Sequence, residues 1–180
     1  GTNELYEITK KFHNALQGYS YSLTLPDQEQ YMDVNEAFST YADIENHDLV
    51  VIHDPQPLPL IECYRKQQPW IWRCHIDLSE PNQQLWNFLK NFIIQYDLAL
   101  LSHEQYLKKD LPTMQRIIMP VIDPLTPKNM ELPETRISSL LKQYNIPLDK
   151  PLISQISRFD KWKDPAGVIE IFLKLRSYHD

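Results

Sequence analysis

The sequence predicts an α/β fold with a Rossmann-like parallel sheet flanked by helices. Short runs of β-branched and other apolar residues alternate along the chain with longer segments in which apolar residues recur at helical spacing, and this pattern is typical of parallel strands joined by right-handed crossovers. The composition agrees, because 42% hydrophobic and 23% charged residues in a chain of 180 are ordinary for a globular domain with its own core. Such a fold also predicts where a site lies, since ligands of open parallel sheets bind beyond the carboxyl ends of the strands.

Four short strands are expected in the first part of the chain. The run at 49–52 is continuous and β-branched, which predicts a strand buried on both faces of the sheet. Three further apolar runs, at 70–74, 97–101 and 116–119, predict the other strands. Together they predict a sheet whose neighbouring strands are linked through helices.

Helices are expected before and between these strands. Apolar spacing predicts one over 3–17, with Gly18 at the position of a C-cap, and a weaker, mostly exposed one over 27–41. Short helices are expected at 58–65 and directly after Ser102. A more regular helix, opened by N-cap candidates and a proline, places five apolar residues on one face: Leu85, Trp86, Leu89, Phe92 and Ile93.

A proline-rich segment separates this part from the rest of the chain. Three prolines in the eight residues 120–127 disfavour regular structure and predict a linker. Beyond it we expect a helix over 133–144, a strand over 152–156, a polar turn over 157–164 and a closing helix over 165–176. This order predicts the opening strand-helix step of a second α/β unit.

Charge and composition argue against several classes of partner. The net charge of -6, with scattered basic residues, predicts no nucleic-acid partner. No apolar run approaches the roughly 20 residues of a membrane span, so no membrane association is expected. Cys63 and Cys74 have neither disulfide-framework nor zinc-knuckle spacing, which favours a reducing, cytoplasmic setting. With only 3 glycines, this sequence has no Gly-rich phosphate loop. We expect neither a cofactor nor a metal.

Polar clusters follow three of the predicted strands. Because the carboxyl ends of parallel strands share one edge of a sheet, these clusters are the candidate site. The imidazole of His53 and the carboxylate of Asp54 suit hydrogen bonds to a sugar hydroxyl. The three clusters are His53, Asp54 and Gln56; Arg73, His75 and Asp77; and Arg158, Asp160, Lys161 and Lys163.

Two of these cations form a more specific pattern. Arg158 and Lys163 lie on a turn that leads into the N-terminus of a predicted helix, where the helix dipole favours anions. A planar guanidinium fork beside an ammonium point charge is suited to clamp a diphosphate. The alternative is a solvated, charged turn without a ligand.

Structural alternatives also stay open at the other positions. His53 and Asp54 can form a turn in which Asp54 accepts backbone amides, and His75 can be a core histidine with its hydrogen bonds satisfied. The tryptophans are more typical of core packing than of a platform on which a sugar stacks. They are Trp70, Trp72 and Trp86.

Five motifs carry a resemblance to a known family. They are HNALQ at 13–17, VIHDPQP at 51–57, WIWRCHIDLS at 70–79, IMP and IDP within 118–124, and SRFD and WK within 157–163. In this order and spacing the chain resembles the trehalose glycosyltransferring synthases, which are retaining glycosyltransferases of family 4.

The resemblance implies a two-domain GT-B enzyme that transfers glucose from a nucleotide-glucose to glucose and so forms trehalose. Residues 1–124 would be the second half of the N-terminal, acceptor-side domain, and 125–180 the linker and the first strand-helix step of the C-terminal, donor-side domain. His75 resembles the histidine beside the transferred sugar, and Arg158 and Lys163 resemble the pair that holds the donor diphosphate. The acceptor side would be lined by His53, Asp54, Gln56, Arg73 and Asp77.

The chain also departs from the family pattern. It lacks the Gly-rich loop after an N-terminal strand and the later segment whose glutamate contacts the donor sugar, and it covers under half of a typical member. We therefore expect a fragment or a truncated relative that is inactive by itself. The strand at 152–156 would have a bare edge, so we expect it either to dock against the first unit or to pair with a second copy in a homodimer.

Three other functions fit the same residues less well. One is a non-catalytic remnant that binds a sugar or a protein, and another is part of a trehalose phosphorylase, in which phosphate replaces the nucleotide. The third is a metal-dependent hydrolase with four ligands at adjacent strand ends. Those ligands would be His53, Asp54, His75 and Asp77.

Overall fold

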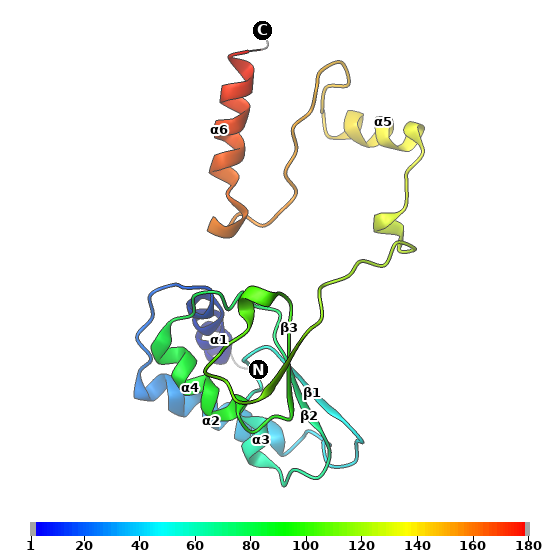
Figure 1. Cartoon of the computed structure of the whole chain (residues 1–180). Coiled ribbons are helices and arrows are strands. Elements are labelled where there is room, and N and C mark those ends of the chain that lie inside the picture. Colours follow the sequence, from blue (N-terminus) through cyan, green and yellow to red (C-terminus); the bar gives the residue numbers. More distant parts are fainter. Residues whose placement is uncertain (1–2, 179–180) are drawn as a thin grey trace. The chain divides into compact units, whose positions relative to one another are not determined.

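A computed structural model describes residues 3–178 and divides the chain into two units (Figure 1). Unit 1 is Gly1–Val121 and unit 2 is Ile122–Asp180. The division falls inside the proline-rich segment 120–127, which is irregular up to Pro127 and so is the linker that the prolines predict. In the described part of the chain, no helix is both long and apolar enough to cross a membrane.

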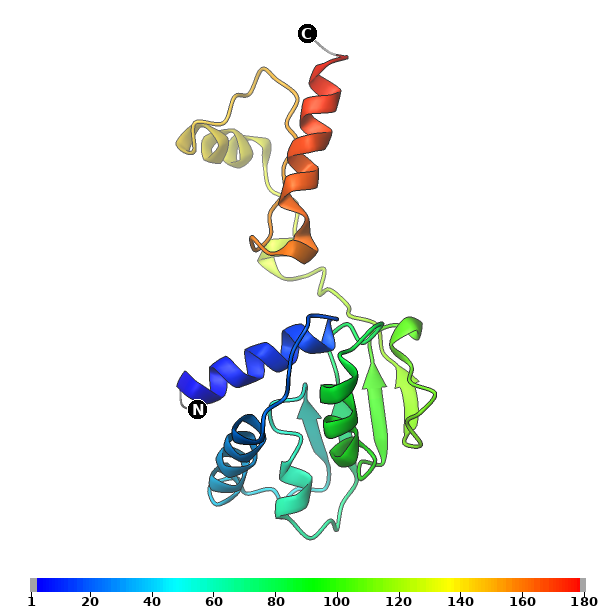
Figure 2. The same cartoon turned by 90° about the vertical axis from the view of Figure 1, so that its left-hand side faces the viewer.

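Unit 1 is built on a parallel sheet of four strands in the order β1-β2-β3-β4. Figure 2 shows the strand arrows pointing the same way. Ile52 pairs in register with Trp72, and Trp72 pairs with Ala99 on the next strand. The predicted α/β class with a parallel sheet is confirmed. The strands are β1 Val50–His53, β2 Trp70–Arg73, β3 Leu98–Leu101 and β4 Met114–Ile117.

The predicted helices of unit 1 are present, with boundaries set by their caps. Thr24 opens the second helix in a capping box with Asp27, so this helix starts earlier than the predicted residue 27. Asn82 accepts a hydrogen bond of 3.1 Å from the Leu85 amide and opens the fourth. The elements are α1 Asn3–Leu16, α2 Leu25–Ser39, α3 Leu60–Cys63, α4 Gln83–Ile93 and the 3₁₀ turn η1 Glu104–Tyr106.

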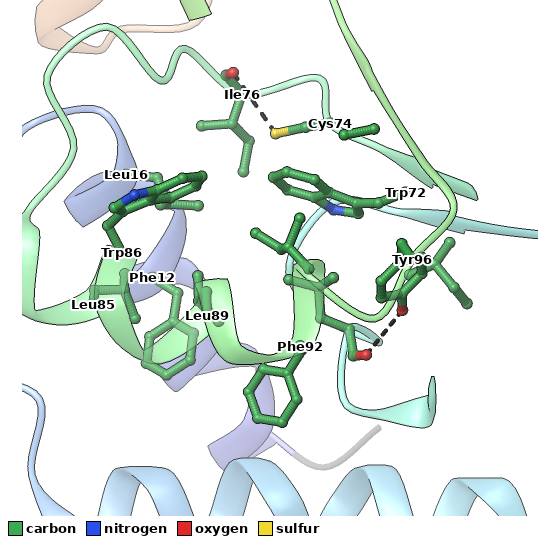
Figure 3. Packing of buried hydrophobic residues seen from close by; sticks show 14 of the residues in the cluster. Phe12, Leu16, Trp72, Cys74, Ile76, Leu85, Trp86, Leu89, Phe92 and Tyr96 are labelled. Atoms are coloured by element: carbon green, nitrogen blue, oxygen red, sulfur yellow. Dashed lines mark hydrogen bonds between the residues drawn. The ribbon is translucent and has the colours of Figure 1, made fainter. Parts of the chain in front are cut away.

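The core lies between these helices and one face of the sheet. Figure 3 shows Trp72 among side chains contributed by α1 and α4. Trp70, Trp72 and Trp86 are each 1% exposed, which confirms their prediction as core residues. The five predicted apolar residues of α4 are also buried. The sheet side chains on this face are Val50, Ile52, Trp70, Trp72, Ala99 and Leu101.

Two predictions about unit 1 are wrong in detail. The strand at 49–52 is not buried on both faces: Val51 is 40% exposed, because β1 ends the sheet and this side chain points away from the helix-covered face. β4 begins at Met114 and not at residue 116, because its register places Met114 opposite Leu98 at the start of β3. The second helix agrees with its prediction as mostly exposed, since among its described residues only Tyr31 and Asn35 are buried.

Unit 2 contains helices but no strand among its described residues. The predicted strand at 152–156 is wrong: this stretch is extended, but it has no neighbouring strand to pair with, and Ile156 is 99% exposed. The closing helix is confirmed, with Asp164 accepting from the Gly167 amide at 3.1 Å. The elements are η2 Pro127–Asn129, α5 Glu134–Gln143, η3 Lys161–Lys163 and α6 Pro165–Arg176.

Candidate functional site

The first two predicted clusters meet at the carboxyl edge of the sheet. His53 is the last residue of β1 and lies opposite Arg73, the last residue of β2. Because the strands are parallel neighbours, the residues that follow them leave the sheet side by side. His53 and His75 are thereby brought into contact.

The two imidazoles form a hydrogen-bonded pair. His53 Nδ1 lies 2.9 Å from His75 Nε2, and the rings are inclined by only 10° with centroids 5.2 Å apart. One nitrogen must donate the proton and the other accept it, so the bond couples the tautomers of the two rings. The remaining nitrogens, His53 Nε2 and His75 Nδ1, are not used by this bond. Both side chains are exposed, so a ligand can reach them.

Asp54 joins the ends of β1 and β2. Its amide donates to the Arg73 carbonyl at 2.8 Å, and its own carbonyl accepts from Trp72 Nε1 at 3.0 Å. Its Oδ1 accepts from the backbone amide of His75 at 2.7 Å. The turn in which Asp54 accepts a backbone amide is thus present, and one carboxylate oxygen is engaged within the protein.

Gln56 and Asp77 lie on the two loops that flank this pair. The Gln56 carbonyl accepts from Asn35 Nδ2 at 3.1 Å, which ties the loop after β1 to α2. Asp77 Oδ1 accepts from the Ser79 amide at 2.8 Å and also from the Ser79 hydroxyl. Hydrogen bonds made by Gln56 and Asp77 therefore fix both loops.

Arg73 is buried at the edge of the sheet, whereas His53 and His75 are exposed. It is only 8% exposed, and its guanidinium donates to the Leu101 carbonyl at 3.1 Å and to the Ile118 carbonyl at 2.7 Å. It thus ties together the ends of β3 and β4. Among residues 3–178 no carboxylate forms an ion pair with Arg73. Its buried positive charge is therefore balanced by hydrogen bonds to the two carbonyl groups.

Cys74 lies between Arg73 and His75, directly after β2, but is not poised as a nucleophile. It is buried, and its thiol donates to the Ile76 carbonyl at 3.8 Å (Figure 3). Burial raises its pKa to about 12, so the thiol stays protonated at neutral pH.

The loop after β3 was not among the predicted clusters. Ser102 Oγ donates to the Cys74 carbonyl at 3.4 Å, so His103 leaves the sheet next to His75. The His103 ring contacts Tyr106 with centroids 5.6 Å apart. Burial, and then the charge of Asp77, raise the pKa of Tyr106. Lys108 Nζ donates to the Ser79 carbonyl at 3.3 Å, which places this loop beside the loop after β2. The available signal was that a histidine lies at or just after the end of each of three consecutive strands.

The third cluster lies in unit 2 and is described by itself. Arg158 is 82% exposed by its side chain and forms an ion pair of 3.3 Å with Asp160. Lys163 ends η3, directly before α6. Asp164 caps α6 with its own carboxylate, so the first turn of the helix already has an acceptor. An anion here would be held by the two cations more than by the helix.

The residues of the hydrolase alternative are bonded to one another and to the backbone. His53 and His75 share a bond, and Asp54 accepts from the His75 amide. Across the described part of the chain, no three His, Cys, Asp or Glu side chains gather in a metal-binding arrangement.

A groove of about 440 Å³ runs along β1. Of the predicted site residues only His53 lines it, and its other walls include the apolar side chains of Phe38, Leu49 and Val51. Such walls suit apolar contacts better than sugar hydroxyls. The carboxyl edge of the sheet, rather than this groove, therefore gathers the predicted polar residues.

Several known proteins are similar to this chain in sequence. The family model described as "Trehalose synthase, N-terminal domain" matches residues 1–108. A trehalose synthase of Thermococcus litoralis is 46% identical over 178 residues, covering 98% of this chain and 43% of its own length. One from Rubrobacter xylanophilus is 39% identical over 179 residues, covering 96% and 43%. A trehalose phosphorylase of Pleurotus pulmonarius is more distant, at 25% identity over 214 residues, covering 97% and 28%.

The chain spans less than half the length of the trehalose synthases that it matches. The similarity includes the strand ends that carry His53, His75 and Arg73, since all three lie within the segment that the family model covers. The family model covers more than half of the chain, and this chain therefore belongs to the trehalose synthase family.

Proposed function

We propose that unit 1 supplies the glucose-binding, acceptor side of a retaining glycosyltransferase that forms trehalose from a nucleotide-glucose and glucose. The observation that carries this is the His53–His75 pair, with its 2.9 Å bond, at the carboxyl edge of a parallel sheet in a chain of the trehalose synthase family. The relatives are trehalose synthases by name, and the activity of the whole protein is part of this proposal.

His75 would contact the transferred sugar in this proposal. Its Nδ1 is the nitrogen left over by the bond to His53, so it can face a hydroxyl while His53 fixes the ring. Asp77 and Gln56 would supply further contacts around the sugar. Arg73 would act from below, because a buried guanidinium makes the edge of the sheet favourable for electron-rich oxygen atoms.

The donor side would involve unit 2. Negative charge grows on the leaving diphosphate as the glycosidic bond breaks, and fixed cations at that position stabilise the transition state. Arg158 and Lys163 are proposed to be those cations. Self-association through residues 152–156 also stays a prediction; it would now have to use an extended segment and not a preformed strand.

The test of this proposal is sugar binding by the purified chain. Glucose and trehalose titrated by calorimetry should bind weakly, and His75→Ala should lower the affinity about tenfold, as expected for the loss of one hydrogen bond in the site. His47→Ala is the matched control, because His47 is also exposed in unit 1 but precedes β1 at the opposite end of that strand. Equal losses in both variants would contradict the proposed site.

A further inference from the structure

Asp54 has an unusual backbone conformation. Its φ is 59°, in the left-handed region that residues other than glycine rarely adopt. Aspartate and asparagine tolerate this region better than most residues, yet the conformation persists only where surrounding contacts fix it. Such a strained residue beside a candidate site calls for a functional explanation.

Three hydrogen bonds fix Asp54 in this conformation. They join its amide to the Arg73 carbonyl, its carbonyl to the Trp72 indole and its carboxylate to the His75 amide, at 2.8, 3.0 and 2.7 Å. The Trp72 bond comes from a fully buried side chain, so it anchors the turn to the core. The carboxylate bond is the one that reaches the backbone of His75.

The carboxylate is therefore aimed at the backbone that carries the imidazole. The His75 ring can pair with His53 Nδ1 only if the His75 Cα is held at the right distance from β1, and the Asp54 carboxylate binds the backbone amide at that position. A charge-assisted hydrogen bond of 2.7 Å is short and strong enough for this task.

We propose that Asp54 is a positioning residue: its carboxylate holds the His75 amide, and through it sets the His75 imidazole against His53. This inference rests on the proposed function in one respect, namely that His75 contacts the sugar. It differs from the sequence prediction, in which Asp54 lines the acceptor side as a direct sugar contact.

Three variants separate these roles. Asp54→Asn keeps both the tolerance for positive φ and an oxygen acceptor for the His75 amide. Asp54→Gly keeps the backbone conformation but removes the acceptor. Asp54→Ala removes the oxygen acceptor and the tolerance for positive φ. It is compared only where circular dichroism shows that it folds. The informative pair is therefore the asparagine and glycine variants.

Two measurements on the purified chain are needed. Nitrogen-15 NMR follows the His75 amide and the imidazole nitrogens of His53 and His75, and calorimetry follows glucose affinity. We expect the asparagine variant to keep the imidazole signals and to bind glucose within about twofold of the parent. The glycine variant should shift the His75 amide and imidazole signals and lose about tenfold in affinity.

The outcomes decide between the two roles. If Asp54→Asn loses as much affinity as Asp54→Gly, the carboxylate contacts the sugar directly and the positioning role is refuted. An unchanged His75 amide in Asp54→Gly refutes it as well. If the parent chain binds no glucose at all, the proposed function fails, while the NMR comparison of the two variants still decides the positioning role by itself.

Discussion

Replacing Trp72 with alanine should lower the free energy of unfolding of unit 1 by about 3–5 kcal/mol, the usual cost of deleting a large buried aromatic side chain. The indole is 1% exposed, and it also donates from Nε1 to the Asp54 carbonyl at 3.0 Å. The substitution therefore leaves a cavity under the sheet and frees the turn that carries the candidate site. Urea denaturation followed by circular dichroism measures the change.

Two further variants sharpen this experiment. Phe38→Ala is the matched control, since it deletes an aromatic ring that is half exposed in the same unit, and it should cost about 1 kcal/mol or less. Trp72→Phe refills most of the space but lacks the indole donor, so it should destabilise less than alanine while still shifting the His75 amide signal. A Trp72→Ala protein as stable as Phe38→Ala would contradict the packing described for this core.

Removing both cations of unit 2, with Arg158→Ala and Lys163→Ala together, should weaken diphosphate binding at least about a hundredfold, because each charged hydrogen-bond donor contributes about 1.5–3 kcal/mol. Arg158→Lys should fall between, since an ammonium group cannot form the planar two-pronged contact. Inorganic pyrophosphate is the probe, which leaves the nucleotide base out of the comparison. Calorimetry at constant ionic strength measures the affinities.

The control for this prediction is a second pair of cations in the same unit. Lys174→Ala with Arg176→Ala removes the same charge from the last turn of α6, away from the turn that precedes this helix. Its effect on pyrophosphate should stay within about threefold, as expected for general electrostatics at a surface. An equal loss in the two double variants would show that pyrophosphate is attracted by net charge alone.

Local patterns predicted most of the elements. The five apolar residues of α4 repeat at helical spacing, and the proline-rich linker disfavours regular structure, so each of these features is encoded within a few residues. Strand limits depend instead on partners distant in sequence. β4 is positioned by its register with β3, and residues 152–156 form no strand because a strand requires a neighbour that local sequence does not reveal.

The candidate site could be predicted only as a set of residues. The parallel topology brings His53 and His75 together, since they lie at the ends of two neighbouring strands. The left-handed backbone of Asp54 and the use of the Arg73 guanidinium as a clamp on two carbonyl groups arise from three-dimensional contacts. Spacing along the chain contains no information about either of them.

Whether the carboxyl edge of the sheet binds the sugar is measured by NMR titration of the nitrogen-15-labelled chain with glucose and trehalose. We expect saturable shifts at the amides of His53, Asp54, His75 and Asp77, with smaller or no shifts along the groove beside β1. Shifts confined to the residues of that groove, such as Phe38 and Leu49, or no saturable shift with either sugar, would contradict this expectation.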